Sequence, residues 1–404
     1  MRESRMSLSF TTMEGKSRGF YILLAVLAAL SVGGFVSFMV SYLEGHHVLG
    51  TSNVIPWGMP IVIAIYLIGL SAGLHILAFF IHILGREEWR SIIRLAVFMA
   101  IVLIFGAMVS ISFDLGRPEK IWRLYMFFYL NSMSSLFAVN AVFYSCYLLA
   151  ASIYLITLFG GNERRSKIMG MVAFCWAMLT HGGTGAIFGL IAAREPWFSS
   201  LRPFEFIMAA LTSSLALLAI VLVVTFKLTS RRIKDELVIS LGKLVAGFLC
   251  GLILLIWVGE LAHAYKPDRE ASLFMLAGPL SYLFWGFQVF LGEVVPLFIL
   301  IHPRFRKTIK GVVTASALVV IGVFFERFYL VIAGLAYPQP YISGKIEGVY
   351  GAVGYFPLTP VESVLSVGTF AFMGFLFLLG LKYLELLPVG QGGEEVTARA
   401  EGRQ

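Results

Sequence analysis

The sequence has little charge: only 13% of its 404 residues are Asp, Glu, Lys or Arg, whereas 59% are hydrophobic. A soluble domain of this length cannot bury so much apolar surface, which excludes a water-soluble fold. The apolar residues form long continuous runs, not the alternating ten-residue segments typical of a membrane barrel. The composition therefore predicts an all-α integral membrane protein that crosses the bilayer several times.

Cysteine is scarce as well. Cys146, Cys175 and Cys250 each lie in a different apolar run, and none belongs to a Cys-x-x-Cys pair. This pattern predicts neither an iron–sulfur cluster nor a cysteine-rich metal site in this chain. The net charge of +8 comes from small basic clusters between the apolar runs. Such clusters are typical of topology determinants and do not indicate nucleic-acid binding.

Ten apolar runs are long enough to span a bilayer. The first is too long for the apolar part of a signal peptide, so it is interpreted as an uncleaved anchor. Residues 1–19 are then a cytoplasmic segment, residues 20–386 a transmembrane domain, and residues 387–404 a disordered cytoplasmic tail. The expected spans are 20–43, 61–84, 92–113, 133–159, 168–193, 205–226, 239–262, 272–301, 310–334 and 361–386.

The distribution of Lys and Arg predicts the orientation. The N-terminal segment, the even-numbered loops and the C-terminal tail hold 22 of the 31 basic residues, and the odd-numbered loops hold 8. Because basic loops stay in the cytoplasm, both termini are expected inside. The last outward loop, 335–360, is rich in Pro, Gly and Tyr and is long enough to fold over the outer face.

The pentapeptide Asp114-Leu115-Gly116-Arg117-Pro118 stands where an apolar run meets polar residues. It places a carboxylate at the outward end of a membrane helix, which Gly and Pro then terminate. A charge at that depth is costly. It indicates either a salt-bridged helix stop or a functional site.

Most of the other ionisable residues also lie towards the outward ends of the spans. This distribution favours a reactive site near the outer leaflet over a transport site at the midplane. Glu326 and Arg327 are neighbours on a helix and point about 100° apart, so they are not expected to pair with each other. Either a buried structural network or catalysis explains them, and the expected partners of Arg327 are Glu260, Glu293 or Glu362.

Three kinds of uncharged group allow two interpretations each. His75 and His181 lie near the middle of their helices, where each either bonds a backbone carbonyl or joins the other in binding a b-type haem. Trp57 and Tyr66 are either interfacial belt residues or an aromatic wall for a flat ring. The Gly69-xxx-Gly73 and Gly185-xxx-Gly189 spacings indicate close helix packing or, less simply, a ligand cradle.

Several of these stretches together resemble the NrfD-like membrane subunits, typified by polysulfide reductase. The resemblance covers roughly residues 55–385, and the ten-helix length is similar to the branch that includes the membrane subunits of hydrogenase-2 and of alternative complex III. It is carried by Pro56-Trp57-Gly58, Gly69-Leu-Ser-Ala-Gly73, Asp114-Leu-Gly-Arg-Pro118, His181, Arg194-Glu195-Pro196-Trp197, Phe284-Trp285, Glu293, Glu326-Arg327, Tyr355-Phe356-Pro357 and Glu362.

The resemblance implies two four-helix bundles with peripheral helices, in the prokaryotic cytoplasmic membrane. It also implies a haem-free subunit of a respiratory oxidoreductase that binds menaquinone or ubiquinone near the outer face. Such a subunit exchanges electrons with a ferredoxin-like iron–sulfur subunit, which serves a molybdopterin-type catalytic subunit. Proton release or uptake is expected near the outer face. A secondary transporter and a haem b cytochrome subunit are the alternatives.

The same resemblance assigns roles to residues of this protein. Asp114 is expected to accept the proton and His181 to bond the second ring oxygen, while Arg117 either tunes Asp114 or holds it. Relatives carry a His near the position of Ala64, or an acid where this sequence has Asn140, and these departures shift the weight to Asp114 and His181. The remaining quinone-binding residues are Trp57, Tyr66 and Asn140. Proton-path or structural charges are His75, Glu205, Glu260, Glu293, Glu326 and Arg327.

Overall fold

The computed structural model describes residues 9–84, 87–130, 135–229, 234–266, 269–338, 351 and 353–389. Within these ranges ten helical stretches are long and apolar enough to cross a membrane, which confirms the expected number of spans. Their bounds are α1 Arg18–Glu44, α2 Met59–Leu84, α4 Ile93–Asp114, α6 Leu136–Phe159, α7 Glu163–Gly189, α8 Arg202–Leu228, α9 Asp235–Ala264, the π-helix η3 Leu283–Val294 continued by α11 Val295–Ile301, α12 Ile309–Phe328 continued by the π-helix η4 Tyr329–Ala333 and by α13 Gly334–Ala336, and α14 Pro360–Tyr383.

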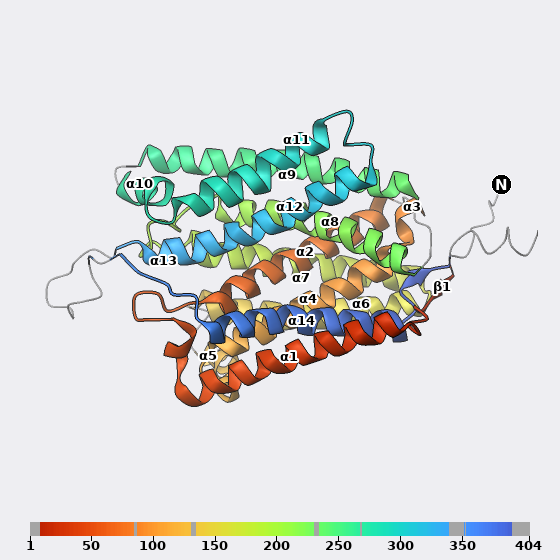
Figure 1. Cartoon of the computed structure of the whole chain (residues 1–404), viewed down its shortest axis with the longest axis horizontal. Coiled ribbons are helices and arrows are strands. Elements are labelled where there is room, and N and C mark those ends of the chain that lie inside the picture. The colour runs from red at the N-terminus through yellow and green to blue at the C-terminus, as the bar shows by residue number, and fades with distance from the viewer. Residues whose placement is uncertain are drawn as a thin grey trace, which may run out of the picture.

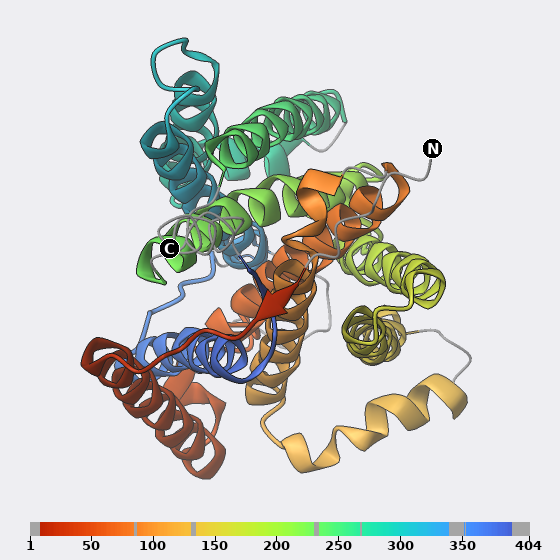
Figure 2. The same ribbon diagram turned by 90° about the vertical axis from the view of Figure 1, so that its right-hand side faces the viewer.

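The spans form two four-helix bundles, as expected. The first contains α2, α4, α6 and α7, and the second contains α8, α9, η3 with α11, and α12. Helix α8 joins them by packing against both α2 and α7. Helices α1 and α14 pack on each other at the periphery, and α14 also contacts α4 (Figures 1 and 2).

Helix α2 lies at the centre of this arrangement (Figure 1). It contacts α4, α7, α8, α12 and α14, and its most apolar 18-residue window is entirely buried. A helix that is apolar on every side is stable only where protein surrounds it. The α2 sequence therefore suits the middle of the molecule, whereas α1 buries little of its surface and faces the lipid.

Short elements complete the fold at both faces. Strands β1 and β2 pair antiparallel, Phe10 opposite Pro388 and Thr11 opposite Leu387, and bring both ends of the described chain to one face. This agrees with an even number of spans. Strand β2 lies at the start of the tail expected to be disordered, and residues 390–404 of that tail lie outside the described residues. The short elements are β1 Phe10–Thr11, η1 His46–Leu49, α3 Glu87–Arg90, η2 Pro118–Lys120, α5 Trp122–Leu130, α10 Arg269–Ala277 and β2 Leu387–Pro388.

The structure corrects one expected span and adds one helix that the sequence did not predict. The expected span 272–301 is split, because Gly278 and Pro279 follow α10 and the spanning part starts only at Leu283. Proline lacks the amide that a continuous helix needs, so the backbone turns there. Helix α5, which the apolar pattern did not predict, runs across the spans beside α6 (Figure 2). Half of the outward loop expected over 335–360, residues 339–350 and 352, lies outside the described residues.

Small residues set the closest helix contacts. Gly73 faces the backbone of Ala210 on α8, so the Gly69-xxx-Gly73 spacing acts in helix packing. Gly185 similarly faces the backbone of Pro203. Helices α1 and α14 meet at Gly34 and Gly368, where a Cβ added to Gly368 would lie 2.4 Å from the Gly34 Cα atom.

We expect Gly368→Ala to lower the unfolding temperature in detergent, because the new methyl group must push α1 away from α14. Overpacking of this kind costs about 1–3 kcal/mol. Gly374→Ala on the same helix is the matched control, because its Cβ would lie 3.5 Å from the Leu27 side chain, an ordinary contact. Equal unfolding temperatures for the two variants would contradict this account.

Candidate functional site

The side chain of Glu362 connects the last span to the start of the central helix. Glu362 lies in the first turn of α14, after the N-cap Thr359, and its Oε1 atom accepts the backbone N–H of Met59 at 2.7 Å. Met59 begins α2, so the carboxylate satisfies an amide that has no partner within that helix. A Cβ at Gly58 would lie 2.3 Å from the same oxygen, so this approach requires glycine.

Asp114 lies beside Glu362, and His46 lies beside the turn that follows Asp114. Asp114 ends α4, interacts electrostatically with Glu362, and accepts the backbone amide of Gly58. The backbone then turns at Gly116, whose φ of 65° favours glycine. The His46 ring packs against this turn. We call His46, Asp114 and Glu362 the outer corner.

Each member of the outer corner keeps a buried atom with no hydrogen-bond partner among the described residues. These atoms are His46 Nε2, Asp114 Oδ1 and Glu362 Oε2. Buried polar atoms are nearly always bonded, so three together indicate a position for water or for a ligand with hydroxyl groups. Burial lowers the pKa of His46 below its usual value, although the Phe113 carbonyl that accepts from the ring opposes the shift. At neutral pH this ring is therefore uncharged.

Trp57 is part of an aromatic stack next to the outer corner. Its ring lies parallel to that of Trp197, with centroids 5.6 Å apart and an interplanar angle of 9°, and it also contacts Phe137 and Phe188. The indole N–H of Trp197 donates to the Leu330 carbonyl at 2.7 Å. Trp197 therefore covers one face of Trp57, and the suggestion that Trp57 and Tyr66 form an aromatic wall for a flat ring stays a prediction.

His181 is completely buried on α7. Its Nε2 atom donates to the Phe206 carbonyl oxygen, 2.7 Å away. The Nδ1 atom is then an acceptor, and it has no partner among the described residues. The ring packs against Gly69 and Phe206, and Phe206 packs against Phe188. The aromatic rings of Phe206, Phe188 and Trp57 therefore form a series from His181 towards the outer corner. The group that His181 bonds in this structure is the Phe206 carbonyl.

The other predicted quinone-binding residues lie apart. The Tyr66 hydroxyl donates to the Val320 carbonyl at 3.0 Å, so this side chain faces α12. Arg117 is exposed and does not pair with Asp114, against the expectation that it holds the carboxylate. Because Arg117 follows the turn at Gly116, it can point to solvent. Asn140 is buried, donates to the Leu136 carbonyl, and faces Gly183 with an Oδ1 atom that lacks a described partner.

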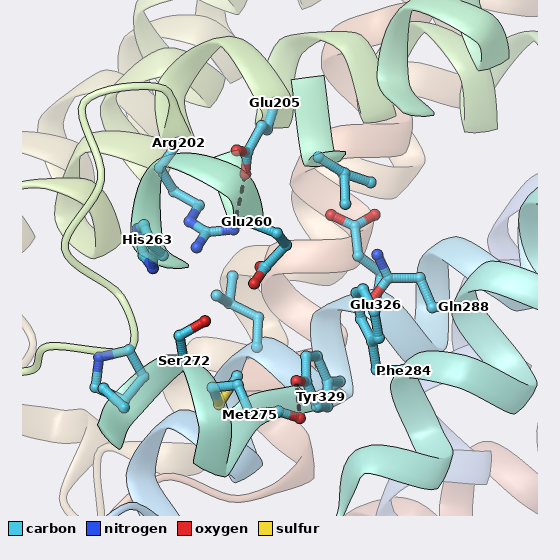
Figure 3. Close-up of a pocket in the computed structure, with 14 residues that line it drawn as sticks. Arg202, Glu205, Glu260, His263, Ser272, Met275, Phe284, Gln288, Glu326 and Tyr329 are labelled. Atoms are coloured by element: carbon cyan, nitrogen blue, oxygen red, sulfur yellow. Dashed lines mark hydrogen bonds and ion pairs between the residues drawn. The ribbon is translucent and has the colours of Figure 1, made fainter. Parts of the chain in front are cut away.

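A second polar cluster lies inside the other bundle, around a cavity of about 30 Å³ (Figure 3). Arg202 and Glu205 form an ion pair of 2.7 Å at the start of α8, and Glu260 and Glu326 approach from α9 and α12. The space suits about two water molecules and is too small for a quinone ring. This cluster therefore brings together Glu205, Glu260 and Glu326 of the predicted structural or proton-path residues, whereas His75 lies in the first bundle.

Glu326 and Arg327 pair with each other, so the expectation that each needs a partner on another helix is wrong. Their side chains approach to 3.0 Å between Glu326 Oε1 and Arg327 Nη1. The two Cα–Cβ directions do diverge, but both side chains are long enough to bend together. Arg327 also lies over the Phe206 ring, 3.8 Å from its centroid. An unpaired charge in this apolar interior would cost more than the bend.

The π-helical geometry of η3 explains how Glu293 reaches its neighbour. A π-helix bonds residue i to residue i+5, which puts side chains five apart on one face. Gln288 and Glu293 are five apart, and the amide donates to the carboxylate at 3.4 Å. Glu293 thus faces Gln288 on its own helix and keeps Oε2 without a described partner.

His75 and His82 face α6 through tyrosines. Tyr147 bonds His75 Nδ1 at 2.6 Å, and Tyr154 bonds His82 Nδ1 at 2.8 Å. His181 faces α8 instead, so His75 and His181 bond to different helices. The suggestion that they share a haem stays a prediction.

His46 and Arg202 belong to these sites although the sequence pattern did not single them out. His46 lies in a Gly-flanked turn before the second span, where nothing in the local pattern indicates burial. Arg202 precedes Glu205 by three residues, a spacing at which side chains on a helix meet. The sequence could therefore have predicted this ion pair. Glu362 is predicted as an outward acid and as a partner for Arg327, but it binds at the outer corner.

The fold and the site define a class: a ten-span helical membrane protein with buried acids and histidines at one end of its helices. Residues 47–339 match the family described as polysulphide reductase, NrfD. This chain belongs to that family. It is a multi-pass integral membrane protein of the prokaryotic inner membrane.

Named relatives match most of the sequence. The Hdr-like menaquinol oxidoreductase integral membrane subunit of Archaeoglobus fulgidus is 33% identical over 95% of this protein and 98% of its own length. A selenate reductase subunit of Mesobacillus selenatarsenatis is 27% identical, covering 92% and 95%. The menaquinone reductase integral membrane subunit of Nitratidesulfovibrio vulgaris is 25% identical, covering 85% and 86%. Each is a subunit of a named reductase or oxidoreductase.

We expect His46→Gln to reduce the acid sensitivity of folding. The folded-state pKa of His46 is below its usual value, so the unfolded chain binds the proton first as the pH falls through 6.5. The free energy of unfolding therefore decreases below that pH, and glutamine removes this contribution. Unfolding temperatures at pH 7.5 and 5.5 should differ less in the variant than in the native protein. Parallel pH profiles would contradict the assignment.

We expect Arg327→Leu to destabilise the protein by about 3–5 kcal/mol, because it leaves Glu326 buried without its cation. The double variant Glu326→Gln with Arg327→Leu should recover most of this loss. Denaturation in detergent measures both. A double variant as unstable as Arg327→Leu alone would show that the ion pair is not the main contribution of Arg327.

Proposed function

We propose that this protein is the quinone-reactive membrane subunit of a respiratory oxidoreductase. The observation that supports this most strongly is the outer corner, where two carboxyl groups and a neutral imidazole keep buried atoms without described partners beside an aromatic stack. Its relatives include the membrane subunits of a menaquinol oxidoreductase and of a menaquinone reductase. Their agreement with the local chemistry supports a quinone over other hydroxylated ligands.

The residues present suit a quinone ring. When bound, a menaquinol or ubiquinol supplies two electrons and two protons at its ring hydroxyls. Asp114 Oδ1 and Glu362 Oε2 are acceptors for such hydroxyl groups, and two neighbouring carboxyl groups can take up and pass on a proton. His46 Nε2 is a third acceptor. The apolar neighbours Trp57 and Phe137 exclude water from one side.

Glu362 therefore joins Asp114 in this proposal as a proton-accepting group. The Glu362 carboxylate is held by the Met59 amide through one oxygen, which leaves the other oxygen able to bond a ligand. The predicted role of His181 at the second ring oxygen is not part of this proposal, because the rings of Phe206, Phe188 and Trp57 lie between His181 and the outer corner. Its Nδ1 atom marks the alternative position for the ring. Because the aromatic series lies between His181 and the outer corner, the effect of replacing His181 can be distinguished from the effect of replacing Asp114 or Glu362.

The electrons pass to partner subunits in this proposal. We infer a ferredoxin-like iron–sulfur subunit at the outer face and, beyond it, a molybdopterin-type catalytic subunit. The names of the relatives, which include parts of a selenate reductase and of a polysulfide reductase, support a complex of this type.

The test uses the protein purified together with its partner subunits. We expect Asp114→Asn to slow quinol-driven reduction of the partner's iron–sulfur clusters by about 10²–10⁴-fold, because asparagine cannot take up a proton. Glu362→Gln should slow it in the same direction. The rate is followed by bleaching of cluster absorbance after addition of menadiol.

Arg117→Gln is the matched control, because this exposed residue follows the same turn and touches neither carboxylate. It should react at nearly the native rate. A native rate for Asp114→Asn would refute the role of the outer corner. If only His181→Gln slows the reaction, the ring binds at the inner end of the aromatic series instead.

A further inference from the structure

A buried polar stripe runs along α6 and takes no part in the proposed quinone chemistry. Its members are Asn140, Tyr144, Tyr147 and Tyr154, whose side chains are at most 6% exposed. The spacings of four, three and seven residues keep them on one face of the helix. Three buried tyrosine hydroxyl groups on one membrane helix need polar partners, because the surrounding medium offers none.

The partners come from α2 and α7. The Tyr144 hydroxyl bonds the Thr184 hydroxyl at 2.9 Å. The Tyr147 hydroxyl lies 2.9 Å from the Ser71 hydroxyl and 2.6 Å from His75 Nδ1. The next pair repeats the arrangement seven residues further along both helices, with Tyr154 bonded to His82 Nδ1 at 2.8 Å.

The two tyrosine–histidine pairs follow one another closely. The His75 ring lies between the two tyrosines, with centroids 5.0 Å from Tyr147 and 6.1 Å from Tyr154. The Tyr154 and His82 rings are 5.8 Å apart. His75 Nε2 is buried without a hydrogen-bond partner among the described residues. This atom is therefore available to exchange a proton between the two pairs.

The series ends at a surface on one side. His82 lines a pocket of about 250 Å³ at the end of α2 that lies on the same face as β1 and β2. Lys167 lines the same pocket, and it lies 3.7 Å from Glu163, which also pairs with Arg90. Lys167, Glu163 and Arg90 lie around His82 at this end of the series.

The other end of the stripe approaches the aromatic stack. Asn140 lies one turn after Phe137, which contacts Trp57. Its Oδ1 atom is buried and has no described partner. The stripe thus extends from the inner pocket almost to the region where the proposed quinone site lies.

We propose that His82, Tyr154, His75, Tyr147 and Tyr144 form the inner part of a proton route through the first bundle, which runs from the inner face past Tyr144 to the outer face. Each group accepts a proton from the neighbour before it and passes one on, so only N–H and O–H bonds break and form. One proton enters at His82 for each one that leaves beyond Tyr144. Imidazole and hydroxyl groups in series are suited to such transfer. Only the destination at the outer end depends on the proposed quinone site.

The experiment measures proton entry into liposomes that contain the full-length protein with its partner subunits. Pyranine reports the internal pH after an external acid jump, with valinomycin and potassium present to balance charge. We expect faster acidification than in protein-free vesicles. Tyr154→Phe and His82→Gln should each reduce the protein-dependent rate by about tenfold or more, because each removes one transfer group.

Tyr125→Phe is the matched control. It also removes a tyrosine hydroxyl bonded to α6, at 2.7 Å from Ser145, but it lies outside the stripe. It should keep the native rate. Native vesicles no faster than protein-free ones, or a Tyr154→Phe rate equal to that of Tyr125→Phe, would overturn the proposal.

This readout needs no quinone. If the outer corner proves unreactive while Tyr154→Phe still loses proton entry, the path stands and the proposed quinone function fails. If quinol reacts at a rate that depends on Asp114 and proton entry is unaffected by Tyr154→Phe, the path fails alone. If Tyr154→Phe unfolds, His82→Gln takes its place in the test. The His82 side chain lies at the pocket and therefore tolerates replacement more easily.

Discussion

The bond between the Glu362 carboxylate and the Met59 amide is the contact on which the outer half of the molecule depends. It ties the last span to the start of the most deeply buried helix. Because α2 contacts both bundles and α14, its position sets the position of most other elements. Removal of that carboxylate would leave a helix amide without a partner at the edge of an apolar medium, where water supplies little compensation.

The same rule, that polar groups inside the membrane need partners, explains how the remaining side chains are distributed. In the second bundle the charges gather around one small cavity, with ion pairs at Arg202–Glu205 and Glu326–Arg327. In the first bundle the buried stripe on α6 consists of tyrosine side chains that bond serine, threonine and histidine side chains of α2 and α7. The charged cluster suits a fixed electrostatic environment, and the uncharged series suits movement of protons.

The outer corner combines two carboxyl groups with an imidazole beside an aromatic stack, and its atoms are not all satisfied. His46, Asp114 and Glu362 converge from three separate parts of the sequence, and each retains one buried atom without a described partner. Fully satisfied polar groups hold a fold together, whereas unsatisfied ones at a surface-facing corner are available to a ligand.

Some features followed from the sequence alone. Apolar run length determined ten helical spans, since a bilayer core requires about 20 apolar residues per crossing, and motif order indicated the family. The depth of Asp114 at a helix end was also readable. Tertiary structure alone decided that Glu362 joins Asp114, that Arg117 points away, and that Glu326 pairs with its neighbour. Those outcomes depend on which helices touch and on side-chain bending, and apolar periodicity contains no information on either.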